Sequence, residues 1–223
     1  MNNVIVVSTH PDDEMFGVGG TLLKHAENND SITWLIITSM LESDGYSKDR
    51  VTSRNQEIDK IASEIGIKNV VKLDVPVMSL DSSTLQSLIP SIADVFQKYQ
   101  PSIIYTLNRS DVHSDHRITF DAVYSCTKSF RFPFIKRVLM YECISETEFA
   151  PALAEKIFIP NYFVDISKYM DKKIELIGVY ESEIGEHPFP RSNKNVEALA
   201  TFRGATAGVE YAEAFHLLKF IDK

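Results

Sequence analysis

Cysteine is scarce in this sequence, and its scarcity excludes two common architectures. Only Cys126 and Cys143 occur among the 223 residues, and they form no Cys-x-x-Cys motif. A cysteine-ligated zinc site and a secreted domain held by disulfides are therefore not expected, and we predict two buried free thiols.

Long apolar runs and surplus positive charge are absent as well. No stretch approaches the roughly 18 consecutive apolar residues of a membrane-spanning helix. The 31 acidic residues outnumber the 23 lysines and arginines, giving a formal charge of −8, which argues against non-specific binding to nucleic acid or to an anionic membrane. The segment Met1-Asn2-Asn3 lacks the basic region of a signal peptide, so we expect a cytoplasmic protein. The oligomeric state stays open, and a homo-oligomer is compatible with these features.

What the sequence does contain is an alternation of strand-like and helix-like segments. Strand-like apolar runs occur at 4–8, 32–38, 70–73, 102–106 and 137–141, and helical spacing at 17–28, 50–64, 82–99 and 115–129. This alternation predicts βαβ units and a mostly parallel sheet covered by helices on both faces, a three-layer α/β sandwich. Pro90, inside the third helical segment, predicts a kink or a split of that helix.

The pattern loosens after Glu146. We expect a strand at 162–166, a helix at 172–183, a loop or lid at 184–209 and a last helix at 211–220. The chain is predicted to form a single domain over 1–223, with a core of 1–145 and a short C-terminal extension and lid of 146–223.

The most informative motif is His10-Pro11-Asp12-Asp13-Glu14, directly after the first apolar run. Parallel sheets bind ligands beyond the carboxyl ends of their strands, and this motif lies at such an end. His10 and Asp13 can converge in a tight turn, and their side chains are good zinc ligands. Asp12 would then stand beside the metal as a base, with Glu14 supporting a ligand or facing the next helix. Helix capping by Asp12 or Asp13 is the alternative, but it explains only one of the carboxylates.

A second cluster, His113-Ser114-Asp115-His116, follows the strand-like run at 102–106. One imidazole would complete a His/Asp/His ligand set, and the other would stay unligated as an acid or electrophile near the metal. Asp115 could orient an imidazole, and Asp111 could cap or support the loop. The alternative is a polar helix start with surface histidines.

The remaining histidines and one aromatic segment carry weaker signals. His25 and His216 are expected on helices in structural roles, whereas His187 has some chance of lining the site. The segment at 130–134, Phe-Arg-Phe-Pro-Phe, is a candidate sugar-binding lip, although a buried edge or a subunit contact explains it better.

Three glycines follow the first motif. Gly17, Gly19 and Gly20 fail the Gly-x-Gly-x-x-Gly dinucleotide pattern at its last position and lie too far from the strand. We therefore expect close packing of a helix against the sheet or the metal loop.

With its trailing glycines and the second cluster, the first motif resembles the LmbE-like, or PIG-L-type, N-acetylglucosaminyl deacetylases. The resemblance covers 1–145, a Rossmann-like core in this family, and extends less securely to 211–215, Tyr-Ala-Glu-Ala-Phe. It implies hydrolysis of the N-acetyl group of an N-acetylglucosamine-type sugar or sugar conjugate, a small-molecule substrate.

Carried over by position, the resemblance implies that His10, Asp13 and His116 hold Zn²⁺. Fe²⁺ or another divalent ion also suits such ligands. Asp12 would be the general base, and His113 would polarise or protonate the tetrahedral centre. We count Asp115 with these two as catalytic, because it can orient an imidazole.

The resemblance also implies a substrate-binding pair and contains one departure. Arg54 and Glu57 match the family's Arg-x-x-Glu pair that contacts the sugar, and i,i+3 spacing puts both on one helix face. A surface salt bridge is the alternative for this pair. In Tyr180-Glu181-Ser182-Glu183, glutamate stands where the family usually has glutamine, which affects the substrate end of the pocket and not the metal end.

The same motifs are also compatible with other functions. The scaffold could cleave a different N-acyl or thiol-conjugate amide, or the chain could be a non-catalytic sugar- or metal-binding module. A zinc-dependent phosphoesterase is disfavoured, because carboxylates for a second metal are lacking.

Overall fold

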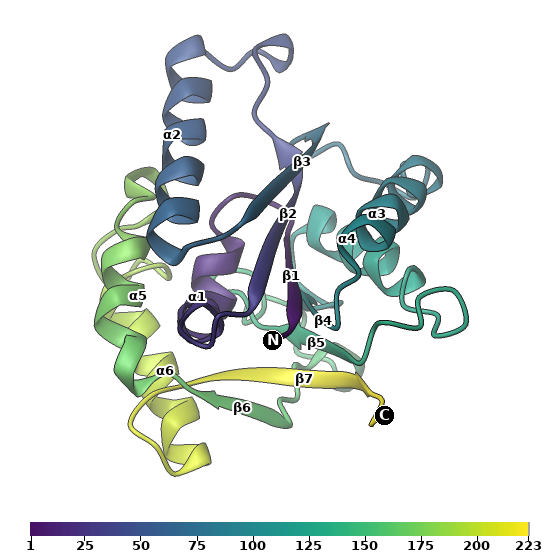
Figure 1. The fold of residues 1–223 in the computed structure, drawn as a ribbon. Helices are drawn as coiled ribbons and strands as arrows, with labels where there is room; N and C mark the ends of the chain where they lie inside the picture. Colours follow the sequence, from purple (N-terminus) through teal and green to yellow (C-terminus); the bar gives the residue numbers. More distant parts are fainter. Residues whose placement is uncertain (223) are drawn as a thin grey trace.

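The computed structural model describes residues 1–222, which form a three-layer α/β sandwich around one seven-stranded sheet (Figure 1). The strands are β1 (Asn3–Ser8), β2 (Ser31–Ser39), β3 (Asn69–Pro76), β4 (Ile103–Leu107), β5 (Arg137–Tyr141), β6 (Tyr162–Asp165) and β7 (Ala212–Phe220). Their order is β3-β2-β1-β4-β5-β7-β6. The first five strands run parallel, and β7 pairs antiparallel with both β5 and β6. The predicted mostly parallel sheet is thus confirmed.

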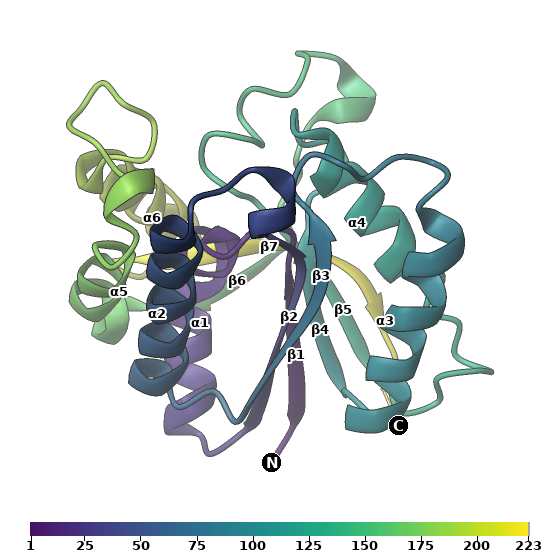
Figure 2. The same cartoon turned by 90° about the horizontal axis from the view of Figure 1, so that it is seen from above.

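Helices cover both faces of this sheet (Figure 2). They are α1 (Asp13–Glu27), α2 (Lys48–Ile65), α3 (Leu85–Tyr99), α4 (Ser114–Ser125), α5 (Met170–Ile177) and α6 (Asn193–Ala207). Alternate residues of β1 serve the two layers: Val4 and Val6 lie in the core beneath α1 and α2, and Ile5 and Val7 in the core beneath α3 and α4. A strand buried on both faces has to be apolar at every position, which explains its continuous apolar run.

The segment 211–220 was expected to be a helix, and this prediction is wrong. Its alanine, glutamate, leucine and lysine residues favour helix by intrinsic propensity. However, β7 has a strand on each side, and Ala212, Ala214 and Phe215 are buried. Two ladders of hydrogen bonds and this burial outweigh local propensity.

The expected loop or lid at 184–209 also needs correction, because it contains α6. This helix buries only Val196, Ala200 and Gly204, one residue in each turn. A stripe composed largely of small residues gives almost no hydrophobic periodicity, so the sequence pattern does not reveal it. Ser192 caps the N-terminus with a side-chain hydrogen bond.

Two further helices differ in smaller ways from expectation. Helix α5 ends at Ile177, where Gly178 follows, and not at Glu183. Helix α3 runs unbroken through Pro90, so the predicted split does not occur. The buried apolar face of α3 holds the helix together despite the missing hydrogen-bond donor of the proline.

Both cysteines are buried and free, as predicted. Cys126 packs in the core beneath α3 and α4. Within residues 1–222, no helix is long and apolar enough to cross a membrane.

Close packing between α1 and β5 depends on Gly17. A Cβ atom at this position would lie 2.2 Å from Tyr141 Cδ2 and 2.9 Å from the carbonyl oxygen of Glu142. Tyr141 is fully buried, and its hydroxyl donates to the Val7 carbonyl at 2.8 Å, so the ring has little freedom to move. The predicted close packing of the helix against the sheet is confirmed at Gly17.

We expect Gly17→Ala to lower the melting temperature. Helix propensity alone would stabilise this variant by about 1 kcal/mol, whereas overpacking costs about 1–3 kcal/mol. Gly19→Ala is the matched control, because its Cβ meets the far end of the flexible Met15 side chain and, at an ordinary contact distance of 3.5 Å, Lys173 Cγ, and it should be neutral or stabilising. Thermal unfolding measures both variants, and a Gly17→Ala protein as stable as its parent would contradict this packing argument.

Candidate active site

The two polar clusters identified in the sequence meet at one edge of the sheet. His10 follows β1, and His113 and His116 lie at the start of α4, which follows β4. These strands are neighbours, and the chain leaves them toward opposite layers (Figure 2), which is where open parallel sheets bind ligands. The ring centroid of His10 lies 4.6 Å from that of His113 and 5.3 Å from that of His116.

Asp13 closes the turn between β1 and α1. Its Oδ2 accepts the backbone N–H groups of Thr9 at 3.0 Å and His10 at 2.9 Å. Its Oδ1 lies 3.4 Å from His116 Nε2 and 3.5 Å from the Cys143 sulfur. The turn therefore occupies one carboxylate oxygen and presents the other to His116.

His116 is oriented by Asp111, a residue that the sequence analysis placed only in a supporting role. His116 Nδ1 and Asp111 Oδ2 lie 2.9 Å apart. Asp111 Oδ1 in turn accepts the Asn108 side-chain amide at 2.8 Å and the Thr147 hydroxyl at 2.7 Å. A carboxylate behind a histidine in this way fixes the tautomer and leaves Nε2 free as a ligand.

His10, Asp13 and His116 together offer three donor atoms that lie within 4.8 Å of one another. His116 Nε2 is 3.4 Å from His10 Nδ1 and 3.4 Å from Asp13 Oδ1. A tetrahedral zinc site with bonds of about 2.0–2.2 Å has edges of about 3.3–3.6 Å. The three side chains thus fit a bridging cation, and imidazole with carboxylate suits Zn²⁺, Fe²⁺ and other divalent ions.

The electrostatics of this group also favour a bound positive charge. Burial alone would raise the pKa of Asp13, but the neighbouring imidazoles of His116 and His10 hold it well below its usual range. Burial alone would lower the pKa of His116, yet the carboxylates of Asp13 and Asp111 raise it to about 10. A cation at this position would take the place of the proton that these groups otherwise share.

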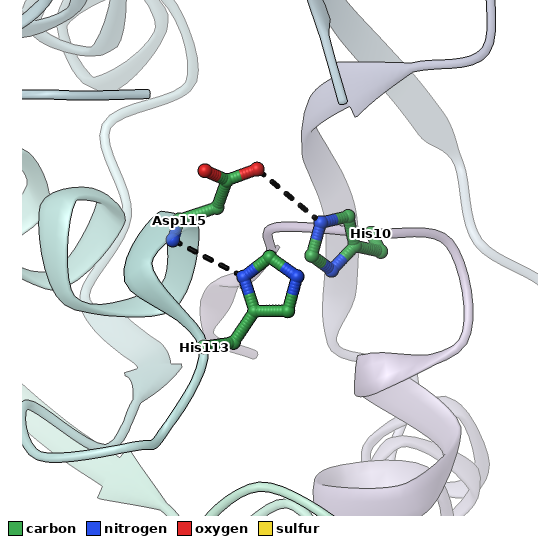
Figure 3. Close-up of side chains that lie close together, drawn as sticks. All are labelled: His10, His113 and Asp115. Atoms are coloured by element: carbon green, nitrogen blue, oxygen red, sulfur yellow. Dashed lines mark hydrogen bonds and ion pairs between the residues drawn. The ribbon is translucent and has the colours of Figure 1, made fainter. Parts of the chain in front are cut away.

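A second donor group consists of His10, His113 and Asp115 (Figure 3). Asp115 Oδ2 lies 3.6 Å from His10 Nε2 and accepts the Met78 backbone N–H at 2.7 Å. The backbone N–H of Asp115 donates to His113 Nδ1 at 3.2 Å. Asp115 thus contacts both residues. The first group is the better cation site because two of its donor-to-donor distances, 3.4 Å each, match a tetrahedral site.

His113 is half-buried, and its ring is held in one tautomer. Because Nδ1 accepts a backbone hydrogen bond, the proton of the neutral ring resides on Nε2. Burial, with the nearby His10 and His116, lowers the pKa of His113 to about 4. The ring is therefore neutral near pH 7 and can donate one N–H into the cavity that it lines.

Asp12 lies in neither donor group, and its backbone is strained. Its φ of 145° lies in a region that costs a non-glycine residue about 1–3 kcal/mol. Its Oδ2 accepts a hydrogen bond from Arg191 at 2.8 Å, whereas its buried Oδ1 has no hydrogen-bond partner among residues 1–222. Burial raises the pKa of Asp12 to about 6 despite Arg191, so this carboxylate can exchange a proton near neutral pH.

Glu14 braces Asp12 from the other side. Its Oε2 accepts the backbone N–H of Asp12 at 3.0 Å, and its Oε1 accepts the Tyr180 hydroxyl at 2.7 Å. Burial raises the pKa of Glu14 to about 8. Glu14 therefore supports Asp12, which belongs to neither donor group, and not a metal ligand as expected. It also links the motif to the segment after α5.

The site opens into a cavity of about 560 Å³, which is within the range of about 300–1,000 Å³ typical of small-molecule sites. Its apolar lining includes the exposed rings of Phe149 and Phe189. Neither the expected lip at 130–134 nor His187 is among the lining residues. Phe132 is instead buried in the core beneath α3 and α4, whereas Phe130 is exposed, so the buried alternative holds for Phe132 and not for the whole segment.

Arg54 lines this cavity, but its partner Glu57 does not. The two side chains form an ion pair with a distance of 3.2 Å between Arg54 Nε and Glu57 Oε2. Arg54 also donates to the Pro11 carbonyl at 2.8 Å and to Glu183. Arg54 and Glu57 therefore do form the salt bridge that we considered as the alternative. Sugar binding by this pair stays a prediction.

Arg191 is the functional candidate that the sequence analysis missed. It lies in the segment assigned to a loop, directly before the cap of α6. A positive charge next to a helix N-terminus is unfavourable, since the helix dipole attracts anions there. That mismatch is the one local signal that this residue serves another purpose.

The other histidines have structural surroundings. His25 on α1 lies 2.7 Å from Asp30 and 2.9 Å from the Tyr105 hydroxyl. His216 lies on strand β7 opposite Met140, and not on a helix as expected.

The chain is similar in sequence to a known protein family and to a protein of known function. A family model described as PIG-L, GlcNAc-PI de-N-acetylase, matches residues 5–127, more than half of the chain. A diacetylchitobiose deacetylase from Thermococcus kodakarensis is 26% identical over 228 residues, covering 98% of this chain and 84% of the relative.

Two solved structures share the fold along almost the whole chain. N,N'-diacetylchitobiose deacetylase from Pyrococcus horikoshii has a TM-score of 0.76 and 21% identity, covering 97% of this chain and 83% of that one. GalB, a 4-carboxy-2-hydroxymuconate hydratase from Pseudomonas putida, has a TM-score of 0.77 and 18% identity, covering 100% and 98%. Since a deacetylase and a hydratase share this fold, the fold alone does not decide the reaction.

Removal of divalent metal should lower the stability of the protein, and added Zn²⁺ should restore it. A ligand at a hundredfold excess over its Kd stabilises by about 2.7 kcal/mol. Thermal unfolding after chelation, with and without Zn²⁺, measures this shift, and titration calorimetry gives the stoichiometry. We expect His116→Ala to abolish the shift and His187→Ala, an exposed histidine outside both donor groups, to retain it. An unchanged shift in His116→Ala would place the ion elsewhere.

Proposed function

Because the chain belongs to the PIG-L (LmbE-like) family, we propose that it is a metal-dependent hydrolase, with Zn²⁺ as the favoured ion. Its reaction is removal of the acetyl group from an N-acetylglucosamine-type sugar or sugar conjugate. The observation that carries the proposal is the His10, Asp13 and His116 donor group beside the unpaired Oδ1 of Asp12. A binding module has no need for a buried carboxylate oxygen without a hydrogen-bond partner next to its ligands.

In this proposal, His10, Asp13 and His116 hold the ion. A bound divalent ion supplies two things, a polarised acetyl carbonyl and a water whose pKa is lowered toward 7. Asp111 and Asp115 keep the two imidazoles in place from behind. Asp115 therefore acts here by positioning, and its predicted catalytic role is indirect.

Asp12 is the general base of the proposed reaction. Arg191 fixes its Oδ2, so that the unpaired Oδ1 takes the proton from the attacking water. The same oxygen can then return that proton to the leaving nitrogen, which departs as a free amine with acetate as the second product. One carboxylate thus carries out both proton transfers.

His113 stabilises the negative charge that develops on the acetyl oxygen. Its Nδ1 is occupied by the backbone of Asp115, so the ring offers Nε2–H as a hydrogen-bond donor to the oxyanion. Of the two roles expected for His113, this geometry favours polarisation over proton donation.

We expect Asp12→Asn to reduce acetate release from N,N'-diacetylchitobiose by about 100- to 10,000-fold, the usual contribution of a general base. Asparagine has almost the same shape as aspartate and, like aspartate, is among the non-glycine residues that most often adopt positive φ, so the fold should persist. Mass spectrometry after incubation measures the loss of the acetyl group, and the Zn²⁺-dependent thermal shift checks the donor group. Equal turnover by parent and variant would refute the base assignment.

Other reactions on the same scaffold are separated by the choice of substrate. The panel should include N-acyl amides other than acetyl and amides of thiol conjugates. Turnover of those compounds alone would identify a different amide hydrolase. Sugar binding with no product from any compound would identify a binding module.

Arg191 should act by positioning Asp12. We expect Arg191→Met to lower kcat by about 10-fold or more, with a smaller change in KM, because a misplaced base affects the chemical step more than substrate binding. Arg191→Lys should recover part of the loss. Steady-state kinetics on the chitobiose substrate separates the two constants, and a change confined to KM would instead make Arg191 a substrate contact.

A further inference from the structure

We propose that Glu183 makes the cavity selective for uncharged N-acetylated saccharides and against sugars that carry an anionic group. This inference rests on the proposed deacetylase function and narrows its substrate class. It starts from the position of Glu183, which lines the cavity at the end of a short 3-10 turn after α5.

Glu183 neutralises the guanidinium groups that face the cavity. Its Oε1 accepts hydrogen bonds from Arg54 and, at 3.4 Å, from Arg50. Its Oε2 lies 3.7 Å from Arg191 Nη1. The nearby Arg54 and Arg191 keep the pKa of Glu183 below its usual value although burial opposes this. The side chain is therefore an anion at neutral pH.

The same two arginines make further contacts inside the protein. Arg54 contacts the Pro11 carbonyl and Glu57. Arg191 donates from Nε to the Ser145 hydroxyl at 2.8 Å and from Nη1 to Asp12 at 2.8 Å. Glu183 thus occupies Arg54 Nη2, and a substrate anion would have to displace this carboxylate from a partly buried ion pair, which is costly because it leaves a charge uncompensated.

The charge of the cavity lining points the same way. Two arginines, Arg54 and Arg191, face three carboxylates, Asp12, Glu146 and Glu183. Because each arginine is paired with a carboxylate, these side chains offer no surplus positive charge to an anionic substituent. Uncharged hydroxyl groups and sugar faces need no such partner, and Phe149 and Phe189 offer apolar surface for them.

Glu183→Gln is the decisive substitution, because it preserves shape and hydrogen-bonding capacity while it removes one negative charge. Glu181→Gln is the matched control, since Glu181 lies in the same turn but is exposed and does not line the cavity. Glu183→Asp, which retains the charge, tests whether packing alone matters.

The experiment compares kcat/KM for N,N'-diacetylchitobiose with kcat/KM for N-acetylglucosamine 1-phosphate and N-acetylmuramic acid. We expect the parent protein to prefer the uncharged sugar at least 10-fold. Glu183→Gln should reduce that preference at least 10-fold, mainly by lowering KM for the anionic sugars. Glu181→Gln and Glu183→Asp should keep the preference of the parent.

Calorimetric binding of the same sugars to the Zn²⁺-loaded Asp12→Asn protein, with and without Glu183→Gln, gives a readout that does not depend on turnover. A parent protein that accepts anionic sugars equally well, or a Glu183→Gln protein with unchanged selectivity in kinetics and binding, would overturn the inference and leave the deacetylase proposal intact. The reverse result, selective binding with no deacetylation of any sugar by the parent, would overturn the proposed function alone.

Discussion

The candidate site depends on two hydrogen bonds that close the turn between β1 and α1. Thr9 and His10 donate their backbone N–H groups to one oxygen of Asp13. This leaves the other oxygen directed at His116, a residue that the chain reaches about a hundred positions later. The backbone of the turn thus holds the Asp13 carboxylate in one orientation. The parallel pairing of β1 with β4 brings the second cluster to the same place. A site built on strand ends can hold its donors to the tolerance that metal coordination requires.

The same turn forces Asp12 into a strained conformation, and the surrounding residues hold it there. Glu14 accepts its N–H, and Arg191 holds one carboxylate oxygen. Gly17 lets α1 approach Tyr141 closely enough for the helix start to stay in this position. Strain of this kind persists only where several contacts over-determine it, and it is typical of active sites. Here the consequence is a buried carboxylate with one oxygen fixed and the other unpaired, next to the three candidate metal donors.

Sequence patterns predicted the parts of the molecule whose signal is local. The apolar strands β1 to β5, the helices between them and both histidine clusters could be read in this way, because periodicity and spacing are properties of neighbouring residues. Strand β7 could not be predicted in this way, because it forms through pairing with a strand on each side. Helix α6 could not be predicted either, because the buried face of this helix consists largely of small residues. The path of the C-terminal loops brings Arg191 and the rings of Phe149 and Phe189 to the cavity. Such loops have no periodic sequence pattern from which this position could be predicted.

The residues before and after β5 contribute differently to the candidate site. The parallel half of the sheet supplies the donor group, whereas the residues after β5 supply the charges and rings that surround it. The second part is tied firmly to the first: buried Glu213 on β7 accepts backbone N–H groups of Gly20 and Thr21 on α1 and the ammonium of Lys173 on α5. Because the C-terminal elements are anchored on the helix that begins at Asp13, changes in Arg191 or Glu183 can alter what the cavity accepts without moving the metal donors. A shared fold thus leaves the reaction to the side chains that surround the site.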